Sequence, residues 1–200
     1  GCVEQVGVGF MFAPAHHSAM KHAIGPRREM GVRTVFNLLG PLTNPAGAPN
    51  QVLGVFSREW VRPLAEVLKR LGSNHVMVVH AADGLDEITV STDTLVAELI
   101  DGEIREYQVS PQQFGIDTHT LDGLIVKDAH ASLALIRSAL GGQPSPAADI
   151  IKLNAGAAIY VAGLADSLEA GVARAAELLA SGAPLVKLDD LAHYSQSLSA

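Results

Sequence analysis

The sequence has almost no cysteine and no long hydrophobic run. Its single cysteine, Cys2, excludes an internal disulfide and fits a reducing cytoplasm. No apolar stretch approaches the roughly 20 residues that a membrane-spanning helix needs, and no signal-peptide pattern is present. We therefore expect a cytoplasmic protein that does not bind a membrane.

Positive charge is also scarce. The chain has 14 Lys and Arg against 21 Asp and Glu, which gives a net charge of −7. This balance opposes binding to nucleic acid or to an anionic membrane, although a local basic pocket could still bind an anion. Hydrophobic residues make up 48% of the chain, which indicates a folded globular protein and not a disordered one.

An initiator methionine is absent, and Gly1 leads almost at once into an apolar segment. We therefore expect the 200 residues to be a C-terminal piece of a longer chain. Their number fits one domain, on the usual scale of about 100–200 residues. The prediction is one α/β domain over residues 1–200, with part of its sheet built from residues upstream of Gly1.

A β-α-β unit is predicted near the middle of the chain. Residues 51–56 are strand-like, and residues 59–71 carry a helical stripe of apolar side chains that ends at Gly72. The continuous apolar run at 76–79 indicates a strand buried on both faces. The two strands should be parallel with a right-handed crossover.

Further elements are predicted on both sides of this unit. Asp101-Gly102 between residues 94–100 and 103–109 is a strong hairpin signal. The fold class is thus α/β, with a mostly parallel central sheet flanked by helices and an antiparallel hairpin. The other predicted elements are a helix end leading into a short buried strand over 3–12, a helix over 17–30 broken at Pro26, and helices over 128–140, 147–164, 167–181 and 188–197.

An acidic stretch, Asp-Gly-Leu-Asp-Glu at 83–87, follows the buried strand. Ligands of open α/β sheets bind outside the carboxyl ends of the strands. Two adjacent carboxylates there, Asp86 and Glu87, suit Mg²⁺, which takes one or two carboxylates and leaves its other positions to water and substrate phosphates. The alternative is a solvated acidic turn.

Histidines and arginines cluster in the first part of the chain. His16, His17 and His22 have poor spacing for a zinc site, so a neutral imidazole that contacts a substrate carbonyl or carboxylate is the better interpretation. Arginine's planar fork fits carboxylate or phosphate, and Arg27 lies where a helix restarts at Pro26. The neighbouring Arg28 and Arg33 are as readily explained by a solvated face.

Two other segments are distinctive. Residues 37–45 form a loop stiffened by prolines, which favours a binding loop or a structural cover over the sheet. Residues 154–158, Asn-Ala-Gly-Ala-Ala, are rich in small side chains, and close helix packing is the preferred interpretation.

Four motifs are distinctive when taken together, namely residues 12–21, 27–45, 83–87 and 154–158. In this order they resemble anthranilate phosphoribosyltransferase, and the resemblance covers essentially the whole chain. It implies transfer of phosphoribosyl from 5-phosphoribosyl 1-diphosphate (PRPP) to anthranilate, which is the second step of the tryptophan branch. It also implies a homodimer with the class III nucleoside phosphorylase fold, whose small helical domain is missing here.

The resemblance assigns roles by position. Arg27 is the anthranilate-binding arginine, His17 the pocket histidine, and Pro41 lines the aromatic pocket. Asp86 and Glu87 are the Mg²⁺-binding pair. Ser18 departs from the proline that the family commonly has after this histidine.

The resemblance also implies that other family motifs lie upstream of Gly1. They are the glycine-rich diphosphate loop, the Lys-His-Gly-Asn stretch, the Mg²⁺-binding serine and most of the dimer helices. We therefore expect this chain to be inactive by itself. Two alternatives remain: a pyrimidine nucleoside phosphorylase of the same fold, which needs no metal, and a nucleic-acid-binding paralogue, which the net charge disfavours.

Overall fold

A computed structural model describes residues 1–11, 40, 42, 44 and 46–198. The chain divides into two compact units, one made of Gly1–Ala48 with Lys187–Ala200 and the other of Pro49–Val186. The helix predicted over residues 17–30 lies outside the described residues. The α/β architecture is found in the second unit, and a single domain over 1–200 stays a prediction.

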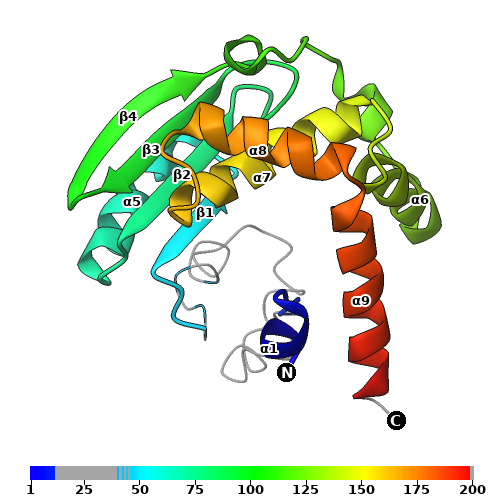
Figure 1. Cartoon of the computed structure of the whole chain (residues 1–200). Coiled ribbons are helices and arrows are strands. Elements are labelled where there is room, and N and C mark those ends of the chain that lie inside the picture. Colours follow the sequence, from blue (N-terminus) through cyan, green and yellow to red (C-terminus); the bar gives the residue numbers. More distant parts are fainter. Residues whose placement is uncertain (12–39, 41, 43, 45, 199–200) are drawn as a thin grey trace, which may run out of the picture. The chain divides into compact units, whose positions relative to one another are not determined.

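The second unit is built on a four-stranded sheet in the order β1-β2-β3-β4 (Figure 1). Strand β1 pairs in parallel with β2, while β2 with β3 and β3 with β4 pair antiparallel. The described sheet is therefore mixed, with one parallel pair out of three. The strands are β1 (Asn50–Gly54), β2 (His75–Ala81), β3 (Thr94–Ile100) and β4 (Glu103–Val109).

The connections explain which pairs are parallel. Between β1 and β2 the chain forms the short 3-10 helix η2 (Arg58–Trp60) and the helix α5 (Val61–Arg70), which gives the predicted β-α-β unit. Residues 82–93, between β2 and β3, contain no helix. A parallel pair usually needs a helical crossover, so a connection without a helix agrees with the antiparallel pairing of β2 and β3.

The hairpin between β3 and β4 is confirmed with the predicted boundaries. Asp101 has a φ of 51° and Gly102 a φ of 74°. Two successive positive φ angles define the type I′ turn, whose twist matches that of the strands. This turn explains why the Asp-Gly signal located the hairpin correctly.

Helices cover both faces of the sheet (Figure 1). Helix α5 packs on one face, and α7 (Pro146–Val161) and α8 (Leu168–Ala180) lie over the other. A Cβ atom on Gly156 of α7 would lie 2.6 Å from the Cα of Val172 in α8, so glycine is what lets the two helices approach. Close helix packing at 154–158 is therefore confirmed.

Side-chain caps fix the starts of three helices in this unit. Asp128, Ser145 and Ser167 each accept a hydrogen bond from a backbone N–H at the start of a helix. Four further helices are described after β4: η3 (Pro111–Phe114), η4 (Leu121–Leu124), α6 (Ala129–Leu140) and α9 (Ala183–Ser197).

The first unit contains α1 (Cys2–Val6), which ends at Gly7 with a φ of 85°. The short buried strand expected up to Phe12 is absent from residues 8–11, and Phe10 is 80% exposed. No strand of the described chain pairs with this segment, and an unpaired strand leaves its backbone without a ladder. Among the described helices, none combines the length and the apolar character that crossing a membrane requires.

Candidate functional site

The acidic stretch forms a tight turn at the carboxyl end of β2. The Gly84 N–H donates to the Ala81 carbonyl at 2.9 Å, and the Ala81 N–H donates to the Leu85 carbonyl at 3.0 Å. Gly84 has a φ of 96°, which L side chains rarely adopt. The chain thus reverses at 81–85, and Asp86 and Glu87 lie just beyond the end of the strand.

Asp83 fastens this turn to the segment that follows it. One carboxylate oxygen accepts the Leu85 N–H at 3.0 Å, and the other accepts the Thr89 hydroxyl at 2.7 Å and the Ser91 hydroxyl. Burial alone would raise the pKa of Asp83, but the hydrogen bonds from Ser91, Thr89 and Leu85 outweigh it and lower the pKa. Asp83 is therefore an ionised structural anchor of the turn.

The last residue of β1 lies directly against the acidic pair. A Cβ atom on Gly54 would lie 1.5 Å from the carbonyl oxygen of Asp86. No side chain can occupy that position without moving the backbone. Glycine at 54 thus allows the strand and the turn to come together.

From the other side, Asn154 of α7 binds the residue after the pair. Its Oδ1 accepts the Ile88 N–H at 3.0 Å, and its Nδ2 donates to the Ile88 carbonyl at 2.8 Å. Ile88 itself is 2% exposed and belongs to the core under the sheet. The acidic pair therefore lies between two fixed points, Gly54 and Ile88.

Both residues of the pair are exposed, although the carboxyl group of Glu87 is partly buried. Burial, and next the negative charge of Asp86, raise the pKa of Glu87. A hard divalent cation would relieve this repulsion, and two carboxylates are the protein ligands that Mg²⁺ commonly takes. The donor set thus fits Mg²⁺, with its other positions left to water and substrate oxygens. Within the described part of the chain, three or more metal-binding side chains do not gather at any point.

A largely apolar cavity of about 460 Å³ adjoins the acidic pair. Asp86 and Glu87 form part of its lining, so the pair borders a space large enough for an organic molecule. The apolar lining comes from Leu85 and from η4, α6 and α7, with Leu121, Leu124, Leu135, Ile150 and Ile151 among the residues.

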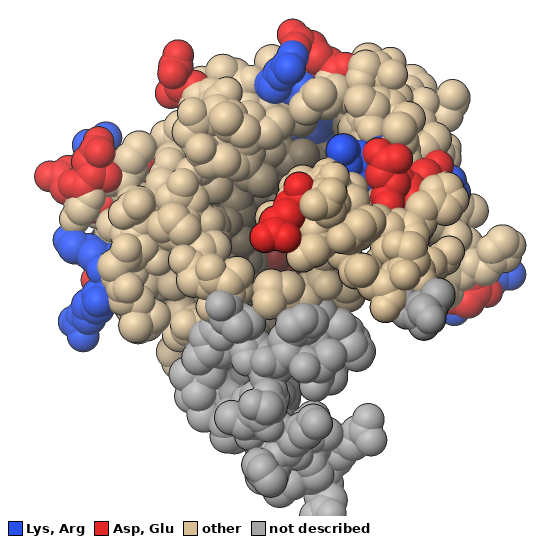
Figure 2. Space-filling view, turned by 60° about the horizontal axis from the view of Figure 1, so that its bottom comes forward, with Lys and Arg blue, Asp and Glu red and all other residues tan. Residues whose placement is uncertain are grey.

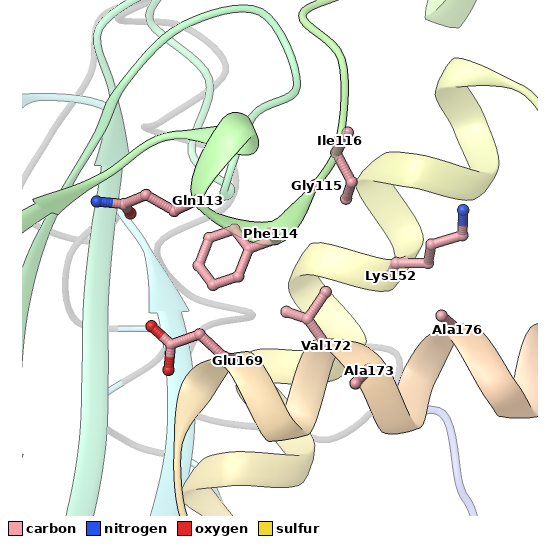
Figure 3. A pocket seen from close by; sticks show the side chains of 9 residues that line it. All are labelled: Gln113, Phe114, Gly115, Ile116, Lys152, Glu169, Val172, Ala173 and Ala176. Atoms are coloured by element: carbon pink, nitrogen blue, oxygen red, sulfur yellow. The ribbon is translucent and has the colours of Figure 1, made fainter.

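A second cavity, of about 400 Å³, lies between η3 and the helices α7 and α8 (Figure 3). Phe114 and Val172 lie between Lys152 and Glu169, which flank it on different sides. Lys152 also donates to Asp149 at 2.7 Å. Neither Asp86 nor Glu87 lines this cavity, so it is separate from the acidic turn.

The charged side chains of the described residues are mixed in sign. On the face drawn in Figure 2, acidic and basic residues form small separate groups, and uncharged residues cover most of the area. No continuous basic surface of the kind that tracks a phosphate backbone is visible among the described residues on that face. This distribution agrees with the net charge of −7.

Three predicted site residues, His17, Arg27 and Pro41, lie outside the described residues. The structure does describe Asp86 and Glu87, and they follow the carboxyl end of a buried strand, as predicted. Sequence reasoning missed the roles of Gly54, Asp83 and Asn154 around them. An isolated glycine inside a strand pattern is a signal of close backbone approach, and it was available at Gly54.

Comparisons with known proteins identify relatives of this chain. Residues 1–185 match the glycosyl transferase family, a/b domain. Over 196 residues the chain is 62% identical to an anthranilate phosphoribosyltransferase from Thioalkalivibrio sulfidiphilus, covering 98% of this chain and 58% of that protein. The chain thus spans somewhat more than half the length of such relatives.

Solved structures show the same relationship. The anthranilate phosphoribosyltransferase of Thermus thermophilus matches with a TM-score of 0.87 and 45% identity, over 95% of this chain and 56% of that one. The Saccharomyces cerevisiae enzyme in complex with PRPP and Mg matches with a TM-score of 0.78 and 28% identity, over 92% and 52%. The resemblance predicted from the four sequence motifs is confirmed.

Proposed function

The chain belongs to the glycosyl transferase family, a/b domain. On this premise we propose that it is part of an anthranilate phosphoribosyltransferase. The reaction forms a bond between the amine nitrogen of anthranilate and C1 of PRPP. The bond from C1 to the diphosphate oxygen breaks, and pyrophosphate leaves with the electron pair. The nitrogen then loses a proton to give N-(5-phosphoribosyl)anthranilate.

The observation that carries this proposal is the acidic pair fixed at the carboxyl end of β2. Asp86 and Glu87 would hold Mg²⁺, and the yeast relative in complex with PRPP and Mg supports the same metal here. Bound Mg²⁺ would supply positive charge to the diphosphate as negative charge grows on it. The chain's own part is to keep both carboxylates beside a cavity that an organic substrate could enter.

The acceptor side of the proposal rests on the sequence motifs. Arg27 would bind the carboxylate of anthranilate and aim its amine at C1, a kind of orientation that can lower a barrier by several kcal/mol, with ~7 kcal/mol reached in well-oriented systems. His17 and Pro41 would line the same pocket. No general base is assigned, because an arylamine needs to lose its proton only after the attack.

The proposal extends to the whole protein. We expect a homodimer in the cytoplasm that uses anthranilate and PRPP in tryptophan biosynthesis. The family motifs for the diphosphate loop are not among these 200 residues, so the chain should form no product by itself. This part of the proposal is supported by the coverage of a longer relative, of whose length the chain matches 58%.

Product fluorescence tests the proposal. The 200-residue chain and the full-length protein would each be mixed with anthranilate, PRPP and Mg²⁺, and formation of N-(5-phosphoribosyl)anthranilate would be followed. Turnover in the full-length protein, lost when Mg²⁺ is chelated, is the expected result. A folded full-length protein that makes no product would refute the proposed function.

Arg27→Ala tests the acceptor assignment. The substitution should raise the KM for anthranilate much more than the KM for PRPP, because it removes a contact to one substrate only. An unchanged KM for anthranilate would remove Arg27 from the acceptor site.

A further inference from the structure

We infer that Asn154 is the positioning residue of the acidic pair: its side-chain amide fixes the backbone that carries Asp86 and Glu87. The inference rests on the proposed function, since it concerns the residues that would bind the metal. It adds a residue that never touches the metal or the substrates. Its effect passes through Ile88.

The contacts are specific to an amide side chain. Asn154 Oδ1 accepts the Ile88 N–H at 3.0 Å, while Nδ2 donates to the carbonyls of Ile88 at 2.8 Å and Ile150 at 2.9 Å. Asparagine offers an acceptor and two donors on one planar group. A carboxylate of the same shape lacks the donors, and an aliphatic side chain lacks both. Asn154 thus satisfies both backbone groups of one residue 66 positions away in the sequence.

The position of Asn154 is itself fixed by packing. Its neighbour Leu153 is 1% exposed in the main core, and Ala157, one residue beyond Gly156, is fully buried. Gly156 lies against Val172 of α8 at a distance that admits no side chain. The helix that carries the amide therefore has little freedom to shift.

Ile88 is separated from Glu87 by one peptide unit and from Asp86 by two, so fixing Ile88 also restricts the backbone of the pair. The peptide bond between Glu87 and Ile88 is planar, so fixing the Ile88 N–H also fixes the plane next to Glu87. On the opposite side, the Asp86 carbonyl is confined against Gly54. Two neighbouring carboxylates repel each other, and a turn held at both ends keeps them together before a cation arrives.

A purely structural role for Asn154 predicts something different. Loss of its hydrogen bonds to a nearly buried residue would lower the fraction of folded protein and the melting temperature. It would not change the metal affinity of the molecules that remain folded. Positioning predicts a change in that affinity, because outer groups that orient metal ligands typically contribute about 10-fold or more to metal binding.

The test uses Mn²⁺ as a probe for the Mg²⁺ site in the full-length protein. Free Mn²⁺ would be titrated by electron paramagnetic resonance, without substrates, in wild type, Asn154→Ala and Asn154→Ser. Serine provides a single shorter hydroxyl and keeps the variant polar in case alanine prevents folding. Val161→Ala, in a buried position seven residues further along the same helix, is the control that lowers stability and removes none of the side-chain hydrogen bonds of Asn154.

We expect both Asn154 variants to bind Mn²⁺ about 10-fold more weakly and the amide of Ile88 to lose protection from hydrogen exchange. Val161→Ala should melt at a lower temperature and bind Mn²⁺ as wild type does. Wild-type Mn²⁺ affinity in a folded Asn154 variant would overturn the inference. Equal weakening in Val161→Ala, or no Mn²⁺ binding by wild type, would overturn it too.

The proposed function is tested separately by product formation. A wild-type protein that forms the product while Asn154 variants keep their Mn²⁺ affinity retains the function and loses the positioning role. A wild-type protein that makes no product, but whose Mn²⁺ binding depends on Asn154, loses the function and retains the positioning role.

Discussion

Gly54 and Asp86 are in such close contact that a side chain at position 54 would overlap the Asp86 carbonyl, with Cβ 1.5 Å from the oxygen. The two residues belong to a strand and to the turn after its parallel neighbour. A parallel pair brings the carboxyl ends of both strands to one edge of the sheet. The acidic pair is thus placed by the β-α-β unit itself.

Gly54→Ala should therefore displace the acidic turn and destabilise the protein. Overpacking against backbone costs typically about 1–3 kcal/mol, and we expect the upper end here. Urea denaturation of the 200-residue chain measures the loss. Gly123→Ala is the matched control, because the nearest atom to its new Cβ is 3.9 Å away. Equal stability of the two variants would contradict the close approach.

The pKa of Glu87 should fall in Asp86→Asn. Burial is the larger cause of the raised pKa and remains, while the charge of Asp86, the smaller cause, is removed. A carboxyl whose pKa is raised on folding destabilises the folded state as pH rises above its unfolded value, near 4.5. In Asp86→Asn, stability should therefore decrease less than in wild type as pH rises above this value. Carbon-13 NMR titration of Glu87 measures the shift, and an unchanged pKa would refute the coupling.

Asp83 should show the opposite pH dependence. Its pKa is lowered on folding despite burial, so its ionised form stabilises the protein above the unfolded value, near 3.8. That contribution is lost as pH falls through the lower folded pKa. Asp83→Asn should be less stable than wild type at neutral pH by about 1 kcal/mol, since the group is partly exposed. The difference should shrink in acid, and a pH-independent difference would contradict the anchor role.

Another carboxylate, Glu98, is buried at 6% exposure away from the acidic turn. It contacts His75 Nε2 at 2.8 Å and accepts the Tyr107 hydroxyl at 2.9 Å. Burial, then the charge of Glu98, raise the pKa of Tyr107 far above its usual range, so the hydroxyl stays a donor. Tyr107→Phe should cost about 1.5–3 kcal/mol by leaving a buried charge short of one donor. Thermal denaturation measures this loss, and an unchanged melting temperature would show that the bond adds nothing.

Local patterns predicted the second unit well. The apolar run at 76–79 is buried as predicted, and Asp101-Gly102 located the hairpin because only certain residues tolerate two positive φ angles. The prediction of a short strand before Phe12 was wrong for residues 8–11, because an apolar segment does not by itself provide a pairing partner.

The acidic pair was predicted from its place after a buried strand, and its supports were not. Asn154 binds a residue 66 positions away, and no local pattern encodes such a contact. The small residues around Asn154 indicated helix packing correctly. That same packing is what places the amide beside Ile88, so the motif has both a structural and a positioning use.

The most direct test of the central claim is turnover by Asp86→Asn with Glu87→Gln in the full-length protein. Both substitutions keep the shape of the side chains and remove the two charges that would bind Mg²⁺. Product fluorescence would be measured over a range of Mg²⁺ concentrations, with circular dichroism to verify the fold. We predict a folded protein whose kcat falls by about 10²-fold or more, which corresponds to at least ~2.7 kcal/mol of lost transition-state stabilisation. An undiminished kcat with the same Mg²⁺ dependence would contradict the account.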